Sequence, residues 1–243
     1  LAAASVGDAI FWYENDGSSP PVWTTRTIDG SADFATSVVA ADVDGDGDID
    51  VLSASSVDSK MAWYENDGNE NFNLDTIAIS AFGSRSVYAI DVNDDGDMDV
   101  LSAQRNGNII AWYENTNGQG SFGSQQIITT NADATCVYAE DLDGDEDMDV
   151  LSASRNDNKI AWYENDGDGN IGSQQIIWAD GLTYVYATDI DGDGDMDVYC
   201  AGGNIAWYEN VNGDGSVWTR HLILIAGSDT SASSIRSAVE GVA

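Results

Sequence analysis

Short runs of apolar and small residues recur along the whole chain, and Gly-, Asn- and Asp-rich segments separate them. Within residues 37–79 four such runs follow one another: "SVVAA", "VLSAS", "MAWYEN" and "NLDTIAI". Their β-branched, aromatic and small residues favour strands, and turns such as "RNDN" (155–158) bound them. No window has the period of an amphipathic helix. The pattern predicts an all-β chain built from units of four short strands.

These units repeat. The element "FWYEND" (11–16) returns as "AWYEND" (62–67), "AWYENT" (111–116), "AWYEND" (161–166) and "AWYEN" (206–210). Its tryptophans are Trp12, Trp63, Trp112, Trp162 and Trp207. Four strands in each unit of about 50 residues are the signature of a β-propeller.

The ends of the chain fit the same period. Residues 1–12 align without gaps to residues 52–63, so the chain begins at the second strand of a unit, and residues 233–243 resemble a first strand. Because 36 residues follow Trp207 and Trp12 is the twelfth residue, the spacing across the two ends is 48. We therefore expect a five-bladed propeller, closed by N- and C-terminal strands that share one blade and leave no free sheet edge.

The closing first strand is expected at about Ser234–Glu240, in a single domain spanning residues 1–243. An open fragment of a longer propeller is the alternative. The expected blades are 230–243 with 1–28, 29–79, 80–129, 130–178 and 179–229.

An acidic loop precedes four of the five Trp elements. The loops are "DVDGDGDID" (42–50), "DVNDDGDMD" (91–99), "DLDGDEDMD" (141–149) and "DIDGDGDMD" (189–197). Carboxylates at positions 1, 3, 5 and 9 suit a hard cation, above all Ca²⁺, and the loops contain no His or Cys for zinc. An EF-hand would need a Glu at position 12, where these loops have Ser or Cys. The alternative is a set of solvated acidic turns.

The loop pattern DxDGDxDxDV, in a unit of this length, resembles the FG-GAP/VCBS-type repeat. That repeat is known from the propeller of integrin α-chains and from many secreted microbial and algal proteins. The resemblance implies four structural calcium sites, with side-chain ligands at positions 1, 3, 5 and 9 and a carbonyl ligand at position 7. The implied ligands are Asp42, Asp44, Asp46, Asp48 and Asp50; Asp91, Asn93, Asp95, Asp97 and Asp99; Asp141, Asp143, Asp145, Asp147 and Asp149; and Asp189, Asp191, Asp193, Asp195 and Asp197.

Two residues depart from the repeat pattern. Asp94 replaces Gly at position 4 and Glu146 replaces Gly at position 6, so a positive φ at position 6 would strain the third loop. The integrin propeller has seven repeats, whereas this chain predicts five blades.

The net charge of the chain limits the classes of partner that it can bind. The sequence has 43 acidic residues and 8 Lys and Arg, a formal net charge of −35. Such a surface repels nucleic acid and anionic membranes and attracts cations. There is no apolar run of transmembrane length. Two widely separated cysteines, Cys136 and Cys200, are expected to be buried thiols.

Other candidate residues have two interpretations each. The Trp-Tyr pairs could stack on sugars, but we expect them to form the core between blades, leaving Trp23, Trp178 and Trp218 on outer strands for contacts. Arg105 and Arg155 occupy equivalent turns and are the candidates to hold a carboxylate or sugar hydroxyls, although an ion pair with a neighbouring acid is the interpretation that we favour. The single His221 is expected on an outer strand, and no catalytic motif is present.

Together these features predict a non-enzymatic, calcium-stabilised binding or adhesion module, extracellular or at the cell surface. Its partner would be a carbohydrate, a protein or another copy of the chain, as the resemblance implies. One alternative is a structural subunit of an extracellular fibre or surface layer. The other is a polysaccharide-cleaving enzyme.

Overall fold

The computed structural model describes residues 3–6, 8–78, 81–130, 133–179, 182–202 and 204–225. Every regular element in these ranges is a β-strand, which confirms the all-β prediction for this part of the chain. A search of the same residues finds no helix with the length and apolarity needed to cross a membrane. The chain divides into two compact units, Leu1–Val137 and Tyr138–Ala243, and each is described by itself.

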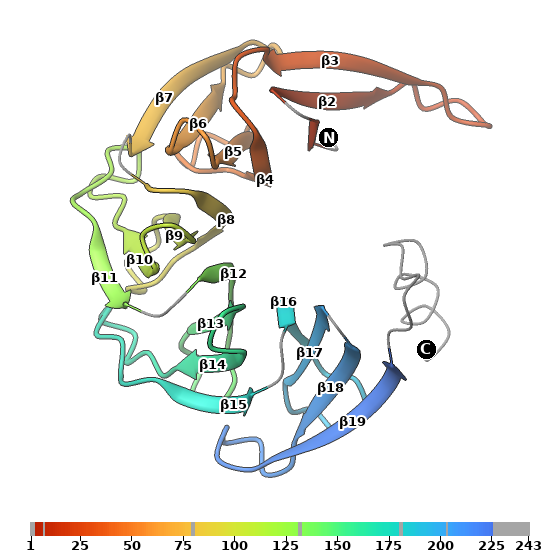
Figure 1. Ribbon diagram of the computed structural model, residues 1–243. Helices are drawn as coiled ribbons and strands as arrows, with labels where there is room; N and C mark the ends of the chain where they lie inside the picture. The colour runs from red at the N-terminus through yellow and green to blue at the C-terminus, as the bar shows by residue number, and fades with distance from the viewer. Residues whose placement is uncertain are drawn as a thin grey trace. The chain divides into compact units, whose positions relative to one another are not determined.

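The first unit contains three antiparallel sheets, in which strands adjacent in sequence lie side by side (Figure 1). A three-stranded sheet contains β1 (Ala3–Val6), β2 (Ala9–Asn15) and β3 (Trp23–Asp29). The next contains β4 (Ala35–Ala41), β5 (Asp50–Ser55), β6 (Lys60–Asn66) and β7 (Phe72–Ala78). The third contains β8 (Ser84–Ile90), β9 (Asp99–Gln104), β10 (Ile109–Tyr113) and β11 (Gln126–Thr129).

The second unit contains two four-stranded sheets of the same order, and the first strand of one of them begins in the first unit. That sheet has β12 (Ala134–Glu140), β13 (Asp149–Ser154), β14 (Lys159–Tyr163) and β15 (Gln175–Ala179). The other has β16 (Leu182–Thr188), β17 (Asp197–Gly202), β18 (Asn204–Asn210) and β19 (Trp218–Ile225). These are sheets of the kind that form propeller blades.

The ends of the chain are described only in part. β1, β2 and β3 supply three strands from residues 1–28, near the bounds expected for the shared blade. The strand expected at Ser234–Glu240 lies outside the described residues. Ring closure, the count of five blades and the blade boundaries therefore stay predictions.

Burial explains why the second strand of a four-stranded sheet is nearly continuous in apolar and small residues. All six residues of β5, β9 and β13 are buried, as in a strand covered on both faces. In the first unit one apolar cluster joins Ile10 and Ile28 of the three-stranded sheet to Val51 and Tyr64 of the next sheet. The sheets thus share their cores by packing face to face.

First strands of the first unit are also joined by serine side chains. The N–H of Val87 in β8 donates to Oγ of Ser37 in β4 at 3.3 Å. In the same way the N–H of Val137 in β12 donates to Oγ of Ser86 in β8 at 3.3 Å. Each serine therefore satisfies a backbone donor at a strand edge that no neighbouring strand pairs.

Most of the Trp-Tyr pairs lie in this core, as predicted. Trp12, Trp63, Trp112, Trp162, Tyr64, Tyr113, Tyr163 and Tyr208 are buried, and Tyr13 and Trp207 are half-buried. The outer-strand residues Trp23 and Trp178 are exposed and Trp218 is half-buried.

A glycine covers the tryptophan of the preceding sheet in both units. Gly120, in the β10–β11 connection, lies against the ring of Trp63, and Gly215, in the β18–β19 connection, lies against Trp162. A Cβ on either glycine would overlap the indole ring, and both glycines have positive φ, of 76° and 65°. The two conditions together admit only Gly at these positions.

Replacing Gly120 tests how much this packing contributes. Gly120→Ala introduces both an unfavourable φ and a collision, whereas Gly17→Ala introduces only the φ penalty, because nothing lies within 4 Å of Gly17 at φ 71°. We expect Gly17→Ala to lower the free energy of unfolding by about 1 kcal/mol. Gly120→Ala should cost about 1–3 kcal/mol more, from overpacking. Denaturant unfolding of both variants measures the difference, and equal costs would contradict the packing role of Gly120.

Candidate metal centres

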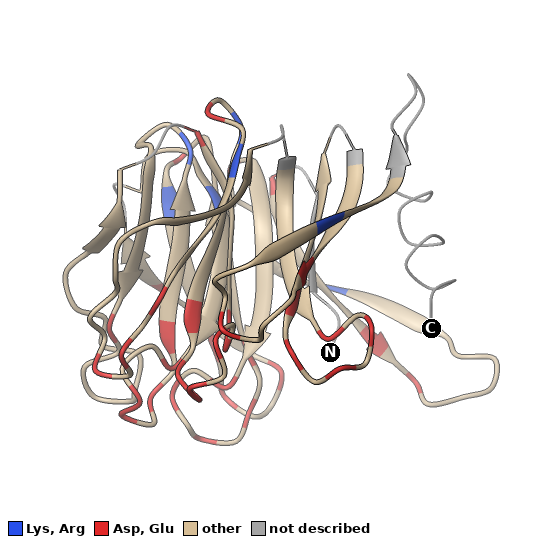
Figure 2. Ribbon diagram, turned by 90° about the horizontal axis from the view of Figure 1, so that it is seen from below, with Lys and Arg blue, Asp and Glu red and all other residues tan. Residues whose placement is uncertain are grey.

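The four acidic loops occupy the same place in each four-stranded sheet. Each connects the first strand to the second, as predicted for a calcium loop on a β-hairpin. Within each unit, Figure 2 shows many of the acidic residues in the loops at one end of the strands. The loops are residues 42–50 between β4 and β5, 91–99 between β8 and β9, 141–149 between β12 and β13, and 189–197 between β16 and β17.

Backbone N–H groups curl each loop around its first and fifth residues. In the first loop Gly47 donates to Oδ2 of Asp42 at 3.0 Å, and Asp48 donates to Oδ1 of Asp46 at 2.8 Å. The same two hydrogen bonds occur in the other three loops. Position 6 has positive φ throughout, and it is Glu146, with φ 77°, in the third loop. The expected strain at Glu146 is therefore present, and Asp94 adds a second non-glycine residue at φ 55°.

The aspartate at position 9 is buried and connects three parts of its sheet. Asp50 accepts hydrogen bonds from the N–H of Val43 at 3.1 Å, from Nε1 of Trp63 at 2.9 Å and from the N–H of Asn66 at 2.7 Å. Its equivalents accept the same two backbone donors. They are Asp99 with Val92 and Asn115, Asp149 with Leu142 and Asn165, and Asp197 with Ile190 and Asn210.

The asparagine of "WYEN" carries a role that the sequence did not reveal. Nδ2 of Asn115 donates to the carbonyl of Val43 at 3.0 Å, and Nδ2 of Asn210 donates to the carbonyl of Leu142 at 2.7 Å. Each of these asparagines ties its own sheet to the acidic loop of the preceding sheet. The presence of Asn in all five copies of the element was the available signal.

Oxygen ligands converge in these loops. Three groups of carboxylates each offer ligand atoms within 4.8 Å of one another: Asp42, Asp44 and Asp46; Asp141, Asp143 and Asp149; and Asp189, Asp191 and Asp197. In the second loop Asn93 provides an amide at position 3. Oδ1 of Asp42, Asn93 and Asp143 is buried and accepts no hydrogen bond from the described residues. Buried oxygens without donors, next to further carboxylates, fit an oxygen-binding divalent cation such as Ca²⁺.

Burial disfavours the charged form of several loop carboxylates. It raises the pKa of Asp149 to about 7 and that of Asp99 to about 6. The pKa of Asp143 rises to about 6, through burial and then the charge of Asp145. Burial also raises the pKa values of Asp44, Asp50 and Asp197. These raised pKa values indicate that the loop carboxylates have no nearby positive charge to stabilise their ionised form. A bound cation would supply that charge and would lower their pKa values.

The side chain at position 7 of each loop lies outside the group of converging carboxylates, against a glycine of a neighbouring turn. The carboxylate of Asp48 lies against Gly68 in the β6–β7 turn, so close that a Cβ on Gly68 would collide with it. The same contact joins Asp97 to Gly118, Asp147 to Gly167 and Asp195 to Gly213. All four glycines have positive φ.

The other residues singled out in the sequence have identifiable surroundings. Arg105 forms an ion pair with the buried carboxylate of Asp133, whereas Arg155 is exposed on the equivalent turn of the second unit. His221 lies on β19, with Nε2 at 2.7 Å from Oε2 of Glu209. Cys136 is half-buried and Cys200 is buried, and both carry thiols.

The raised pKa values predict that the stability of the calcium-free chain depends on pH. Between about pH 4 and about pH 7 the folded chain holds protons on Asp149, Asp99 and Asp143 that the unfolded chain releases, so stability should fall as the pH rises. We expect the melting temperature of the chain, stripped of calcium with EGTA at about pH 7.5 and then dialysed into calcium-free buffers, to be lower at about pH 7.5 than at about pH 5. Asp149→Asn should flatten this slope, and a slope unchanged by the substitution would contradict the assignment.

Comparisons with known proteins agree with this geometry. A family profile described as FG-GAP-like repeat matches residues 1–53, 42–102, 91–152 and 141–200, and every match includes at least one acidic loop. A comparison with curated protein sequences gives no match.

Two solved structures are similar to the chain. One is an Agrocybe aegerita lectin that recognises non-reducing terminal N-acetylglucosamine, with a TM-score of 0.64 and 18% identity over 90% of this chain and 62% of the lectin. The chain thus spans less than two thirds of the lectin's length, and the likeness concerns the fold alone. The other is the V. cholerae biofilm matrix protein Bap1, with a TM-score of 0.49 and 18% identity over 85% of this chain and 30% of Bap1. With its four profile matches and four acidic loops, the chain belongs to the FG-GAP-like repeat family.

Proposed function

We propose that the chain is a non-enzymatic binding or adhesion module, stabilised by calcium and working outside the cell or at its surface. The observation that carries the proposal is the fourfold recurrence of one oxygen-rich loop on an all-β scaffold. In three of these loops a buried oxygen accepts no hydrogen bond from the described residues. Such a scaffold also fixes the positions of the loops at the strand ends opposite the acidic loops. Loops held in this way are where binding residues are usually found.

Calcium would be held by the side chains at positions 1, 3, 5 and 9 and by the carbonyl at position 7. The contact of Asp48 with Gly68 supports the carbonyl assignment, because this side chain is occupied outside the loop. Asp149 and Asp197 already lie within the carboxylate groups of their loops. Their hydrogen bonds leave lone pairs on both oxygens, so a carboxylate at position 9 can still bind an ion.

The role of the ion would be structural. The buried aspartate at position 9 links each loop to the core, so a cation that favours its ionised form would stabilise the hydrogen bonds it accepts. Four Ca²⁺ ions would carry eight positive charges and change the formal charge from −35 to −27. Binding to the folded state alone adds about 2.7 kcal/mol per site when free calcium is 100 times the dissociation constant.

Carbohydrate is the partner class that the comparisons favour. The lectin with a similar fold recognises a terminal sugar, which supports a saccharide ligand here. Exposed Trp23 and Trp178 offer aromatic surface, and Arg105 and Arg155 remain the candidates predicted from the sequence for contacts with a carboxylate or hydroxyl. The proposal also includes a protein as the alternative class of partner.

Calcium stoichiometry in matched variants tests the metal sites. Asp44→Ala and Asp48→Ala remove one carboxylate each from the same loop and change its charge equally. We expect isothermal titration to give four ions for the unchanged chain, four for Asp48→Ala, which keeps the carbonyl, and three for Asp44→Ala. Equal loss in the two variants would show that charge alone attracts the ion, contrary to the assigned ligands.

Chelation tests whether the ions stabilise the fold. Excess EGTA should lower the melting temperature of the chain at about pH 7.5, and added Ca²⁺ should restore it. Mg²⁺ at the same concentration should restore less, because it demands a smaller octahedral site and keeps several of its waters. A melting curve that EGTA leaves unchanged would remove calcium from the proposal.

A glycan array probed with the calcium-loaded chain tests the binding function. We expect retention of specific saccharides with calcium and weaker retention after chelation. Released fragments would instead indicate the polysaccharide-cleaving alternative, and growth of regular assemblies in solution would favour the structural subunit. An array without specific retention would leave carbohydrate out of the proposal and the protein partner in it.

A further inference from the structure

A cavity of about 280 Å³ lies in the first unit, between the sheets that begin with β4 and β8. Its residues come from four segments: the start of β4, the β5–β6 turn, the start of β8 and the β9–β10 turn. All four are at the strand ends opposite the acidic loops, because those loops join the other ends of β4 to β5 and of β8 to β9. The lining residues are Phe34, Ser56, Val57, Gly83, Arg85, Arg105 and Asn106.

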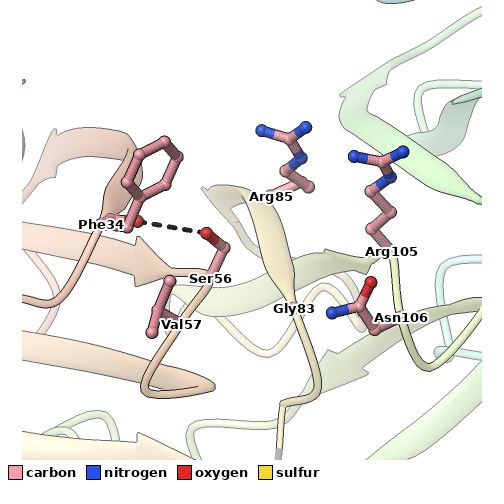
Figure 3. Close-up of a pocket in the computed structure, with 7 residues that line it drawn as sticks. All are labelled: Phe34, Ser56, Val57, Gly83, Arg85, Arg105 and Asn106. Atoms are coloured by element: carbon pink, nitrogen blue, oxygen red, sulfur yellow. Dashed lines mark hydrogen bonds between the residues drawn. The ribbon is translucent and has the colours of Figure 1, made fainter.

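Backbone hydrogen bonds fix the frame of this cavity. The N–H of Ser56 donates to the carbonyl of Phe34 at 3.1 Å, and the N–H of Arg105 donates to the carbonyl of Gly83 at 3.1 Å. Ser56 Oγ also donates to the carbonyl of Phe34, at 3.3 Å. Figure 3 shows the side chains of Phe34, Arg85 and Arg105 projecting to the same side of these segments. The cavity is therefore preformed on rigid elements.

Gly83 keeps the cavity open. The residue just before a first strand is Phe34 before β4, Gly83 before β8 and Asp133 before β12. The carboxylate of Asp133 forms the ion pair with Arg105, so a side chain at this position can occupy a neighbouring arginine. At Gly83 there is no side chain, φ is 65°, and the amide of Asn106 is so near that a Cβ would lie 2.6 Å from its Nδ2.

The charge of the cavity is opposite to that of the chain. Two of its seven lining residues are arginines and none is acidic, although the chain has 43 acidic residues and 8 Lys and Arg. Arg105 is engaged by Asp133. Arg85 is half-buried and makes no ion pair within the described part of the chain. A partly desolvated guanidinium without an acid favours an anionic ligand.

We propose that this cavity binds an acidic saccharide through one carboxylate-bearing sugar residue, an inference that rests on the proposed carbohydrate-binding function. Arg85 pairs with the sugar carboxylate, since a guanidinium offers two parallel N–H donors to a carboxylate. The exposed ring of Phe34 packs on the apolar C–H face of the sugar. Asn106 and Ser56 provide an amide and a hydroxyl for the sugar hydroxyls.

The size and polarity of the cavity favour a sugar over an acidic peptide. About 280 Å³ is near the lower limit for a small-molecule pocket, which suits a single ring. An aromatic ring, an amide, a hydroxyl and a guanidinium around one small space match the alternating apolar and hydroxyl surfaces of a sugar acid. A flexible acidic peptide also offers a carboxylate and hydrogen-bonding groups, but it has no rigid C–H face to pack on the ring of Phe34.

A matched pair of glycans tests the proposal with the calcium-loaded full chain. Immobilised β-1,4-linked oligomers of glucuronate and of glucose share the ring and the linkage and differ by the carboxylate, and hexaglutamate is the peptide probe. We expect binding to the glucuronate oligomer at least tenfold tighter than to either other probe. Arg85→Gln should weaken it at least tenfold, whereas Arg26→Gln, the same charge change on the exposed face of β3 in the same unit, should leave it within twofold.

A second variant separates loss of the site from loss of the fold. Phe34 has a positive φ of 54°, which Asn tolerates, so Phe34→Asn removes the ring and keeps the backbone. It should weaken glucuronate binding with an unchanged melting temperature. Two results would overturn the inference: glucuronate binding that survives Arg85→Gln and Phe34→Asn, or hexaglutamate binding as tight as glucuronate. Tight binding of the glucose oligomer alone would also overturn it while leaving the carbohydrate function standing. Binding to neither glycan would also overturn the inference, and if the array shows no retention either, the carbohydrate-binding function is overturned with it.

Discussion

At the end of each acidic loop a buried aspartate accepts hydrogen bonds from its own loop and from its own sheet, and the packing of the sheets depends on these bonds. Asp99, for example, accepts the N–H of Val92 in its own loop and the N–H of Asn115 at the end of β10. Through its side chain Asn115 then reaches the loop of the preceding sheet, at the carbonyl of Val43. One carboxylate thus couples a loop, its sheet and the neighbouring sheet. A buried, ionised carboxylate is costly unless it is hydrogen-bonded and paired with a positive charge.

This dependence explains the extreme composition of the chain. Packing sheets face to face places one carboxylate per loop in the interior, where burial raises its pKa. A cation held by the neighbouring carboxylates would offset that cost, so the acidic residues that burden the fold also create the site that relieves it. The opposite ends of the strands do not have these acidic loops. In the first unit they hold the cavity with Arg85 and Arg105, whose charge is opposite to that of the chain.

Much of the fold could be predicted from the sequence because the signals are local and repeated. The runs of β-branched, aromatic and small residues, the "WYEN" element and the Asp spacing each lie within about ten residues. In the described part of the chain the structure places strands and loops where these signals predict. The contacts between sheets could not be predicted, because they join residues far apart in sequence. Asn115 contacts Val43, and Gly120 fits the ring of Trp63, without any pattern that pairs them. The engagement of Arg105 by Asp133 and the position of Arg85 in the cavity depend on the same long-range packing.

On the proposed function, calcium and the buried aspartate of each loop act as one unit. Hydrogen exchange of the backbone N–H groups that donate to that carboxylate tests it most directly. The readout is the protection of the amides of Asn66, Asn115, Asn165 and Asn210, in calcium and in EGTA at the same pH. We expect markedly slower exchange at these amides in calcium, with a smaller change at the exposed strand β3. Equal protection with and without calcium at all four would contradict it.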